Sequence, residues 1–433
     1  MSREIKFEVT GRKCIKPSTA TPPQLKTFKL NLLDQLSPNI HGNITFFYSH
    51  DPTTHFSTKS QLLQNSLSQV LTLFYPLAGR LQDSAIHCND EGAFFIETRT
   101  NIPLSDILTS PDFDALQCFL PTTDNETMAT SNGSLLLVRF TSFACGGTAV
   151  TLSLSHKLAD MASLMVLLKS WTAVCNGATA LVVPDLSIGA TLFPPRDIPG
   201  MSASVNTVST VNFTTKRLVF EASKVKELKS KVKTRFDPSR VEVVLALIWK
   251  CALLASRSKT TSFKHSILFQ AVNLRPRMEP PVPDTAVGNF IWAFAVTVEK
   301  GSDMELHVMV SRMRDNMNEF MKTKAEKFKE EGAFGVVMES MKERGEVLRE
   351  RECVMVFKCS SWCNFPLLKV NFGWGEAVWM SSVNKYVSNT IALMDTKDGG
   401  IEAFVTLDQQ QMALFEQDQE LLHYALINPS VII

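Results

Sequence analysis

The sequence has no long hydrophobic run and almost no net charge. Nowhere do 18 apolar residues follow one another, and the N-terminal stretch MSREIKFEVTGRK alternates charged with apolar residues, unlike a secretory signal. The 44 basic residues nearly balance the 43 acidic ones, leaving a formal charge of +1, so the chain lacks the basic excess typical of proteins that bind nucleic acid or anionic membranes. These absences predict a cytoplasmic protein whose partner is a small neutral molecule.

Motifs of several catalytic classes are also missing. The nine cysteines form no CxxC pair, which disfavours both a zinc site and a disulfide framework. Neither HxxxH nor HExxH occurs, and GxSxG, a P-loop and GxGxxG are absent as well. We therefore expect no metal and no permanently bound cofactor, and the chemistry must come from ordinary side chains.

Length and composition indicate two globular domains, because 433 residues with 45% hydrophobic content can fill two cores. Strand-like and helix-like segments alternate in both halves, which predicts α/β architecture. The stretch 183–215 contains four prolines and many Ser and Thr residues without a helical period, as an interdomain crossover does. We predict an N-terminal α/β domain over 1–185, a crossover linker over 186–215 and a C-terminal α/β domain over 216–433.

A predicted hairpin leads to one histidine. The stretches SLLLVRFTSF and TAVTLSLSH are strand-like and are joined by the turn signal Cys145-Gly146-Gly147, so the second strand ends at His156. The run DMASLMVLLKSWTAVCNG then predicts a helix with Asp160 as its N-cap and Gly177 at its end. His156 thus lies between a strand and a helix, where side chains are displayed into clefts on a rigid support.

The spacing of His156 and Asp160 has several interpretations. The two residues could form an acid–base pair or a metal-ligand pair, although no third ligand is evident. They could also be structural, with the imidazole bonded to nearby backbone and Asp160 capping the helix. The remaining chemical interpretation is a lone histidine base, because imidazole changes charge near neutral pH and can take a proton from an alcohol. The spacing alone leaves these alternatives open.

Several other motifs accompany SHKLAD in a fixed order. They are YPLAGRL from Tyr75, NLRPRMEPPVP from Asn273, VGNF from Val287 and NFGWG from Asn371. In this order they resemble the plant BAHD acyltransferases, and the resemblance extends from CIKPSTATPP at Cys14 to the C-terminus. The stretches KPSTATP, HCNDEGAFFIE and GIEAFVTLDQQQMALFEQDQELL resemble the branch that acetylates alkaloids and terpenoids.

The resemblance implies two mixed α/β domains of similar size with a solvent channel between them, the fold of CoA-dependent acyltransferases. Acyl-CoA enters this channel from one face and the acceptor from the other. The resemblance makes His156 the general base, which deprotonates the acceptor hydroxyl as it attacks the thioester. Asp160 is then a support of the catalytic loop that points away from the channel and pairs with an arginine.

The chain departs from the family pattern at two positions. The family's DFGWG has become NFGWG, and its aspartate pairs with the arginine that is Arg275 here, so we expect Asn371 to accept a neutral hydrogen bond from Arg275. The motif members Gly373, Trp374 and Gly375 are expected to serve packing and close chain approach. Met161 replaces the glycine of HxxxDG, and we expect it to occupy an ordinary helical position and to line the acceptor side of the channel.

The sequence further suggests where CoA binds. Ser239 followed by Glu242 predicts a capping box at the start of a buried helix, and Ser239 and Arg240 are candidate phosphate-binding residues because helix N-termini attract anions. A purely structural cap is the alternative. The family resemblance, and for the acetyl group the branch resemblance alone, implies a monomeric O-acyltransferase that uses acetyl-CoA on a polycyclic alcohol, an alkaloid or a triterpenoid. Transfer to an amine and a non-catalytic ligand-binding role are the alternatives.

Overall fold

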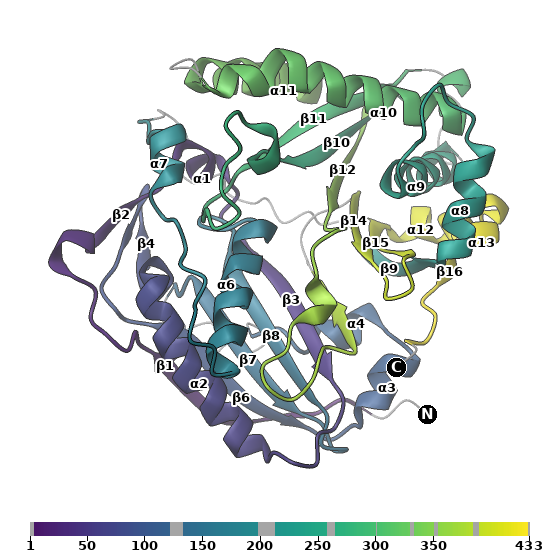
Figure 1. The fold of residues 1–433 in the computed structure, drawn as a ribbon. Coiled ribbons are helices and arrows are strands. Elements are labelled where there is room, and N and C mark those ends of the chain that lie inside the picture. The colour runs from purple at the N-terminus through teal and green to yellow at the C-terminus, as the bar shows by residue number, and fades with distance from the viewer. Residues whose placement is uncertain are drawn as a thin grey trace.

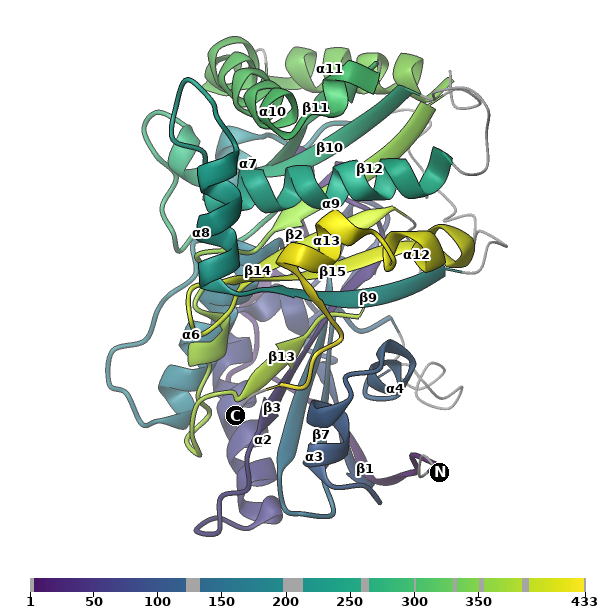
Figure 2. The ribbon, with the colours of Figure 1, turned by 90° about the vertical axis from the view of Figure 1, so that its right-hand side faces the viewer.

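The computed structural model describes residues 4–121, 133–197, 213–257, 265–299, 301–329, 333–349, 354–383 and 389–431. Two β-sheets, each covered by helices, form the body of the molecule (Figures 1 and 2). The mixed α/β fold with two sheet-containing domains is therefore as predicted. Of the predicted linker 186–215, residues 198–212 lie outside the described residues, and the part before them contains α7 (Ile188–Leu192).

The first sheet has six strands in the order β1-β6-β7-β8-β3-β13. Neighbouring strands are antiparallel except for the parallel pair β6 and β7. The bounds are β1 (Phe7–Ile15), β3 (His41–Tyr48), β6 (Ala93–Thr100), β7 (Leu136–Ser142), β8 (Thr148–Ser155) and β13 (Trp379–Ser381). A three-stranded sheet lies beside it, formed by β2 (Thr27–Lys29), β4 (Arg80–Gln82) and β5 (Ala85–His87).

Two long helices, α2 (Phe56–Leu73) and α6 (Met161–Cys175), lie side by side on one face of the first sheet (Figure 1). The indole nitrogen of Trp171 in α6 donates to the hydroxyl of Ser66 in α2 over 2.9 Å. Helix α2 ends at Leu73, and a short 3-10 turn, η2 (Tyr75–Ala78), follows it. Its second residue, Pro76, disfavours α conformation in the residue before it. The shorter helices of this half are α1 (Leu32–Leu36), α3 (Leu104–Thr109) and α4 (Phe113–Gln117).

The second sheet has seven strands in the order β11-β10-β12-β14-β15-β9-β16. Their bounds are β9 (Phe213–Phe220), β10 (His265–Asn273), β11 (Ile291–Val298), β12 (Val354–Ser361), β14 (Thr390–Asp395), β15 (Ile401–Asp408) and β16 (Leu426–Ile427). The helices of this half are α8 (Ala222–Lys231), α9 (Arg240–Arg257), α10 (Leu306–Phe320), α11 (Ala333–Arg349), α12 (Gln409–Phe415) and α13 (Gln419–Tyr424).

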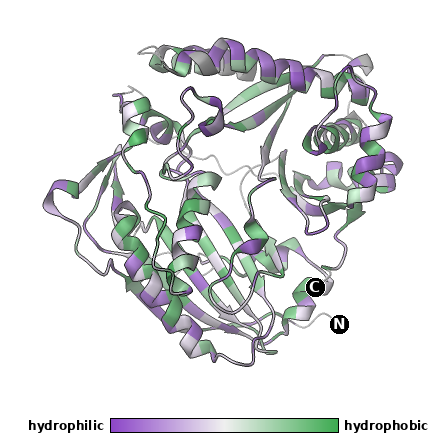
Figure 3. Cartoon of the chain, in the orientation of Figure 1, coloured by the Kyte–Doolittle hydropathy of each residue, from purple (hydrophilic) through white to green (hydrophobic). Residues whose placement is uncertain are grey.

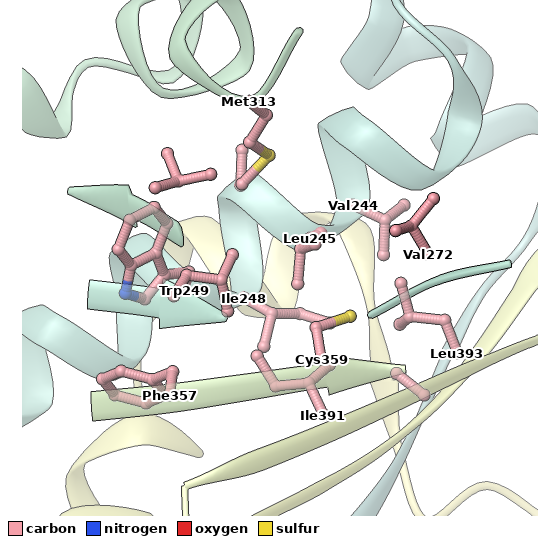
Figure 4. Packing of buried hydrophobic residues seen from close by; sticks show 14 of the residues in the cluster. Val244, Leu245, Ile248, Trp249, Val272, Met313, Phe357, Cys359, Ile391 and Leu393 are labelled. Atoms are coloured by element: carbon pink, nitrogen blue, oxygen red, sulfur yellow. The ribbon is translucent and has the colours of Figure 1, made fainter. Parts of the chain in front are cut away.

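Helix α9 forms the centre of the second core. Its residues from Val243 to Ala252 are buried apart from Lys250, as expected for a helix that is apolar on nearly all sides. Figure 4 shows Val244, Leu245 and Ile248 of this helix packed above the strands of the second sheet. By contrast, α8 carries many hydrophilic residues (Figure 3). No helix in the described part of the chain has both the length and the apolar character needed to span a membrane.

One segment of the C-terminal half returns to the first sheet. Strand β13 pairs with β3, where Trp379 lies opposite Phe47 and stacks on it at 5.4 Å between ring centroids. The preceding NFGWG stretch also packs there, since Phe372 and Trp374 belong to the first core. The two sheets therefore do not divide the chain cleanly at the predicted linker, because residues from about 367 to 383 cross back to the N-terminal half.

Candidate active site

His156 is the first residue after β8. The predicted hairpin is confirmed, since β7 and β8 pair antiparallel from Ser142 opposite Thr148 to Leu136 opposite Leu154. The His156 amide donates to the carbonyl of Ile40 over 2.8 Å, and its own carbonyl accepts from the Nδ2 of Asn289 over 2.8 Å. The backbone of this residue is therefore held on both sides.

The imidazole of His156 is half-buried, and its Nδ1 is fully buried without a hydrogen-bond partner among the described residues. Because Nδ1 faces protein and not a carboxylate, there is no His–Asp dyad of the kind that orients the base in a catalytic triad. The structure brings His156 to the wall of a cavity. The imidazole therefore lies at the cavity without a carboxylate partner.

Asp160 has a different set of partners. It is the N-cap of α6, accepting from the Ser163 amide over 2.9 Å, which confirms the predicted cap. Its carboxylate also accepts two hydrogen bonds from Arg275, over 2.7 and 3.1 Å, and one from the Phe290 amide over 3.0 Å. Burial acts to raise the pKa of Asp160, but the charge and hydrogen bonds of Arg275, with the amides of Ser163 and Phe290, hold that pKa below its ordinary value. Asp160 is thus an ionised anchor of the loop.

The cavity beside His156 encloses about 230 Å³ between the two halves of the molecule. The N-terminal half contributes the start of β3, the end of β8 and the start of α6, and the C-terminal half contributes the ends of β10 and β12. Val272 of β10 lines it and packs against Val244 of α9 (Figure 4), so this wall is backed by the second core. Cavities between domains are common ligand sites.

Met161 is the first residue of α6 and lines the cavity while half-buried. Its φ is not among the positive values of the chain, so the prediction of an ordinary helical position is confirmed. A side chain there replaces the empty space that a glycine would leave. The role of Met161 on the acceptor side stays a prediction.

The expected contact between Asn371 and Arg275 is wrong. The Arg275 side chain is bound by Asp160, Ser163 and backbone carbonyls, with a further contact to Asn273. The Asn371 carboxamide instead accepts from the amides of Gly373 and Gly375, over 2.8 and 3.1 Å. The asparagine therefore organises its own turn, and a neutral oxygen suffices for that task because both donors are uncharged amides.

The two glycines of NFGWG adopt positive φ values of 111° and 110°. A Cβ at Gly373 would meet its nearest atom at 3.6 Å, and one at Gly375 would meet nothing within 4 Å. Glycine is therefore required at both positions by the positive φ of the backbone. The expectation that these glycines allow a close approach of another chain segment is wrong. Trp374 packs against Tyr48 and Phe140, with ring centroids 5.9 Å apart in both pairs, and so serves the first core.

Ser239 and Arg240 do not line the cavity. The capping box is confirmed, since the Ser239 amide donates to Glu242 over 2.7 Å and the Glu242 amide to the Ser239 hydroxyl over 3.2 Å. A carboxylate of the chain thus already lies at this helix start. Arg240 donates to the Gly399 carbonyl over 2.6 Å and to Asp395 over 3.0 Å. The structure favours the structural cap, and binding of CoA there stays a prediction.

Several residues that line the cavity lie outside SHKLAD, NFGWG and the other motifs of the sequence. Ser360, Ser361 and Trp362 lie at the end of β12, Phe365 follows them and Ser382 lies after β13. Only the order of the strands brings them opposite His156, and the return of β13 is not visible in local periodicity. Among the described residues, no group of three or more His, Cys, Asp or Glu side chains is placed to hold a metal ion.

Comparison with known proteins identifies the family of the chain. The model of the Transferase family matches residues 5–422. The chain belongs to this family, the BAHD acyltransferases. This acyltransferase is 36% identical to akuammiline synthase 1 of Alstonia scholaris over 417 residues, which cover 95% of this chain and 96% of the relative. It is 34% identical to a limonoid 7-O-acetyltransferase of Citrus sinensis over 459 residues, 98% of each chain.

A third relative of the acyltransferase transfers to nitrogen. The 17,18-epoxy-17-hydroxycur-19-ene N-malonyltransferase of Strychnos nux-vomica is 32% identical over 426 residues, 97% of this chain and 90% of the relative. Among solved structures, vinorine synthase aligns at a TM-score of 0.85 with 32% identity, covering 97% of this chain and 98% of that one. TRI101 of F. sporotrichioides, solved with coenzyme A and T-2, shares the fold at a TM-score of 0.70 and 17% identity over 93% and 99% of the two chains.

Proposed function

We propose that this acyltransferase is an acetyl-CoA:alcohol O-acetyltransferase in which His156 is the general base. The observation that carries the proposal is the placement of His156 on the wall of a cavity between the two halves, with Asp160 committed to Arg275. A base in that place can meet an acceptor from one side and a thioester from the other. The oxygen atoms of Asp160 already accept hydrogen bonds from other donors, so only the imidazole of His156 is left to take the proton of the acceptor.

The reaction follows from these groups. The second imidazole nitrogen, Nε2, takes the hydroxyl proton as the acceptor oxygen attacks the thioester carbonyl, forming a tetrahedral oxyanion. Ser360, Ser361 and Ser382 line the cavity and supply hydroxyl donors of the type that stabilises such an oxyanion. Collapse breaks the carbon–sulfur bond, and the imidazolium returns its proton to the CoA thiolate. The products are the ester and free CoA, and no acyl-enzyme forms.

The relatives support a bulky polycyclic acceptor. The limonoid 7-O-acetyltransferase is named for the transfer of an acetyl group to an oxygen of a limonoid. The apolar part of the cavity wall suits such a molecule, and its apolar members include Ile40, Leu154, Val272, Ile291 and Phe365. We propose an alkaloid or triterpenoid alcohol as the acceptor and acetyl-CoA as the donor.

Transfer to an amine is the second candidate function. The N-malonyltransferase relative covers nearly the whole chain at 32% identity, and a histidine base serves an amine nucleophile in the same position. The chemistry of His156 does not discriminate between the two acceptors. The non-catalytic alternative is dropped, because the family is one of acyltransferases. The cytoplasmic location and the monomeric state stay predictions.

The test is a turnover assay. Purified protein is incubated with acetyl-CoA or malonyl-CoA and a panel of polycyclic alcohols and amines, and free CoA thiol is measured. We expect thiol release with acetyl-CoA and at least one alcohol, and mass spectrometry of a plant extract incubated with isotope-labelled acetyl-CoA then identifies the acceptor by its mass shift. Release with amines alone would replace the proposal by the amide-forming alternative.

A further inference from the structure

Three consecutive backbone amides of the C-terminal half are held by side chains of the N-terminal half. In the segment Gly288–Phe290, the first amide donates to the Ser163 hydroxyl over 3.1 Å, the second to Asp34 over 2.7 Å and the third to Asp160 over 3.0 Å. We call these contacts the amide clamp. Successive backbone amides can form a concavity that binds acceptor groups, and here the Ser163 hydroxyl and the carboxyl groups of Asp34 and Asp160 occupy it.

The side chain of Asn289 extends the amide clamp to the catalytic loop. Its Nδ2 donates to Asp34 over 2.8 Å and to the carbonyl of His156 over 2.8 Å. Asn289 and Asp34 are both completely buried. The Oδ1 of Asp34 accepts from the Asn289 backbone amide and also faces the Asn289 carboxamide, so the NH₂ end of that carboxamide and not its oxygen faces Asp34 and His156. A turned carboxamide would place its oxygen against both the carboxylate and the carbonyl.

The other oxygen of Asp34 is also occupied. It accepts from the Nδ2 of Asn31, the N-cap residue of α1. The ionisable groups that influence this carboxylate include Asp160, whose negative charge opposes its ionisation, and Lys157, which interacts with it favourably. Asp34 is therefore tied into α1 on one side and into the Asn289 carboxamide on the other.

The imidazole of His156 has no comparable anchor. Its Nδ1 lacks a partner among the described residues, so the direction of the ring depends on the backbone that carries it. That backbone is fixed by the Ile40 carbonyl from its own half and by Asn289 from the other half. We propose that Asp34 and Asn289 are positioning residues for His156, and this proposal rests on the proposed role of His156 as general base.

This role links the position of the base to the contact between the two halves. If the C-terminal half moves, Asn289 moves with it and the His156 carbonyl loses its donor. A displacement of about 1 Å at a reacting group lowers a rate by roughly 100-fold. Asn289 and Asp34 do not line the cavity, so their removal should leave binding of CoA intact.

The test compares Asn289→Ala with a matched control, Gln411→Ala. Gln411 is 2% exposed and its carboxamide donates to the Ala252 carbonyl over 2.7 Å, which is a buried amide contact of the same kind outside the cavity wall. We expect kcat of Asn289→Ala to fall about 10- to 100-fold with the KM of acetyl-CoA nearly unchanged, whereas Gln411→Ala loses stability only. Asp34→Asn keeps the shape of the side chain but replaces one of the two oxygens that accept from Asn31 and Asn289 by an NH₂ group that cannot accept, and its kcat should fall as well.

Two further measurements separate the outcomes. Calorimetric titration with CoA gives the fraction of folded, binding-competent protein. The second measurement is the carbon-13 resonance of the His156 imidazole, labelled at Cε1, which reports the environment of the ring without turnover. It is assigned as the resonance that is missing from the spectrum of His156→Ala. We expect that resonance to shift in Asn289→Ala and in Asp34→Asn but not in Gln411→Ala. If Asn289→Ala does not fold, the near-isosteric Asp34→Asn decides the question.

The two proposals fail in different ways. Absence of turnover by the wild type together with a shifted resonance would reject the proposed function and retain the positioning role. Wild-type turnover with unchanged kcat and an unchanged resonance in the folded variants would overturn the positioning role alone.

Discussion

The guanidinium of Arg275, from the C-terminal half, donates two hydrogen bonds to the carboxylate of Asp160, from the N-terminal half, over 2.7 and 3.1 Å. Both side chains are almost fully buried, with 1% and 2% of their surfaces exposed. This pair joins the two halves directly behind the loop that carries His156. Because Arg275 binds the carboxylate of Asp160, this carboxylate is not a partner of the His156 imidazole.

Breaking this pair should be costly. Arg275→Met removes the cation and leaves Asp160 buried without its main partner, so we expect the free energy of unfolding to fall by about 3–5 kcal/mol. Urea denaturation of the two proteins at neutral pH measures the difference. Arg277→Met is the control, because Arg277 lies in the same short turn but donates to the Asn273 carbonyl and not to a buried carboxylate. Equal losses in the two variants would contradict the account.

A carboxylate at position 371 should change little. The oxygen of Asn371 accepts from two amides of its own turn, and an aspartate side chain in its place could accept the same hydrogen bonds. We expect Asn371→Asp to shift the free energy of unfolding by less than about 1 kcal/mol and to leave kcat unchanged, while Asn371→Ala loses about 1 kcal/mol because two donors lose their acceptor. A large gain in rate for Asn371→Asp would show that position 371 influences the chemistry.

Some contacts of the site can be predicted from the sequence and others cannot. The hairpin, the Asp160 cap and the capping box at Ser239 follow from local patterns and are confirmed. The partner of Arg275 could not be obtained in this way, because Asp160 and Asn371 lie far from it in sequence and each offers an acceptor. Only the packing of the two halves decides between them.

The residues that line the cavity can also be predicted only in part from the sequence. His156 and Met161 are local to SHKLADM and were identified, whereas Ser382 reaches the cavity because β13 leaves its own half and pairs with β3. A three-residue strand has too little periodicity to be recognised. Asn289 belongs to the VGNF stretch, but this motif does not predict its contacts with the His156 carbonyl and with Asp34, a residue that no motif marks.

The ionisation of Asp34 should affect stability. Burial raises the pKa of Asp34 to about 8, although hydrogen bonds from Asn289 and Asn31 offset part of the effect. In the unfolded chain the pKa of this carboxyl group is about 4. Between about pH 4 and pH 8 the folded protein therefore keeps a proton on Asp34 that the unfolded chain has lost. The free energy of unfolding consequently decreases as pH rises across that interval. Asp34→Asn lacks the titration, and its Tm should fall less than that of the wild type between about pH 5 and pH 8. Parallel curves would contradict the raised pKa.

Met161 should influence which acceptor fits. It lies at the start of α6 and lines the cavity, so Met161→Ala enlarges the space beside His156 while retaining a good helix former. We expect the ratio of kcat/KM between a bulky and a small acceptor to change by about tenfold. The Kd of CoA serves as the control and should stay the same. An unchanged ratio would place Met161 outside the acceptor's path.

The central claim is that His156 alone removes the acceptor proton. The most direct measurement is the rate of CoA thiol release from acetyl-CoA, with an accepted alcohol, by the wild type, His156→Ala and His87→Ala. The last is a control on an exposed histidine of β5. We predict a loss of at least about 100-fold for His156→Ala, with unchanged unfolding and CoA binding, and no loss for His87→Ala. Thiol release by folded His156→Ala at close to the wild-type rate would contradict this claim.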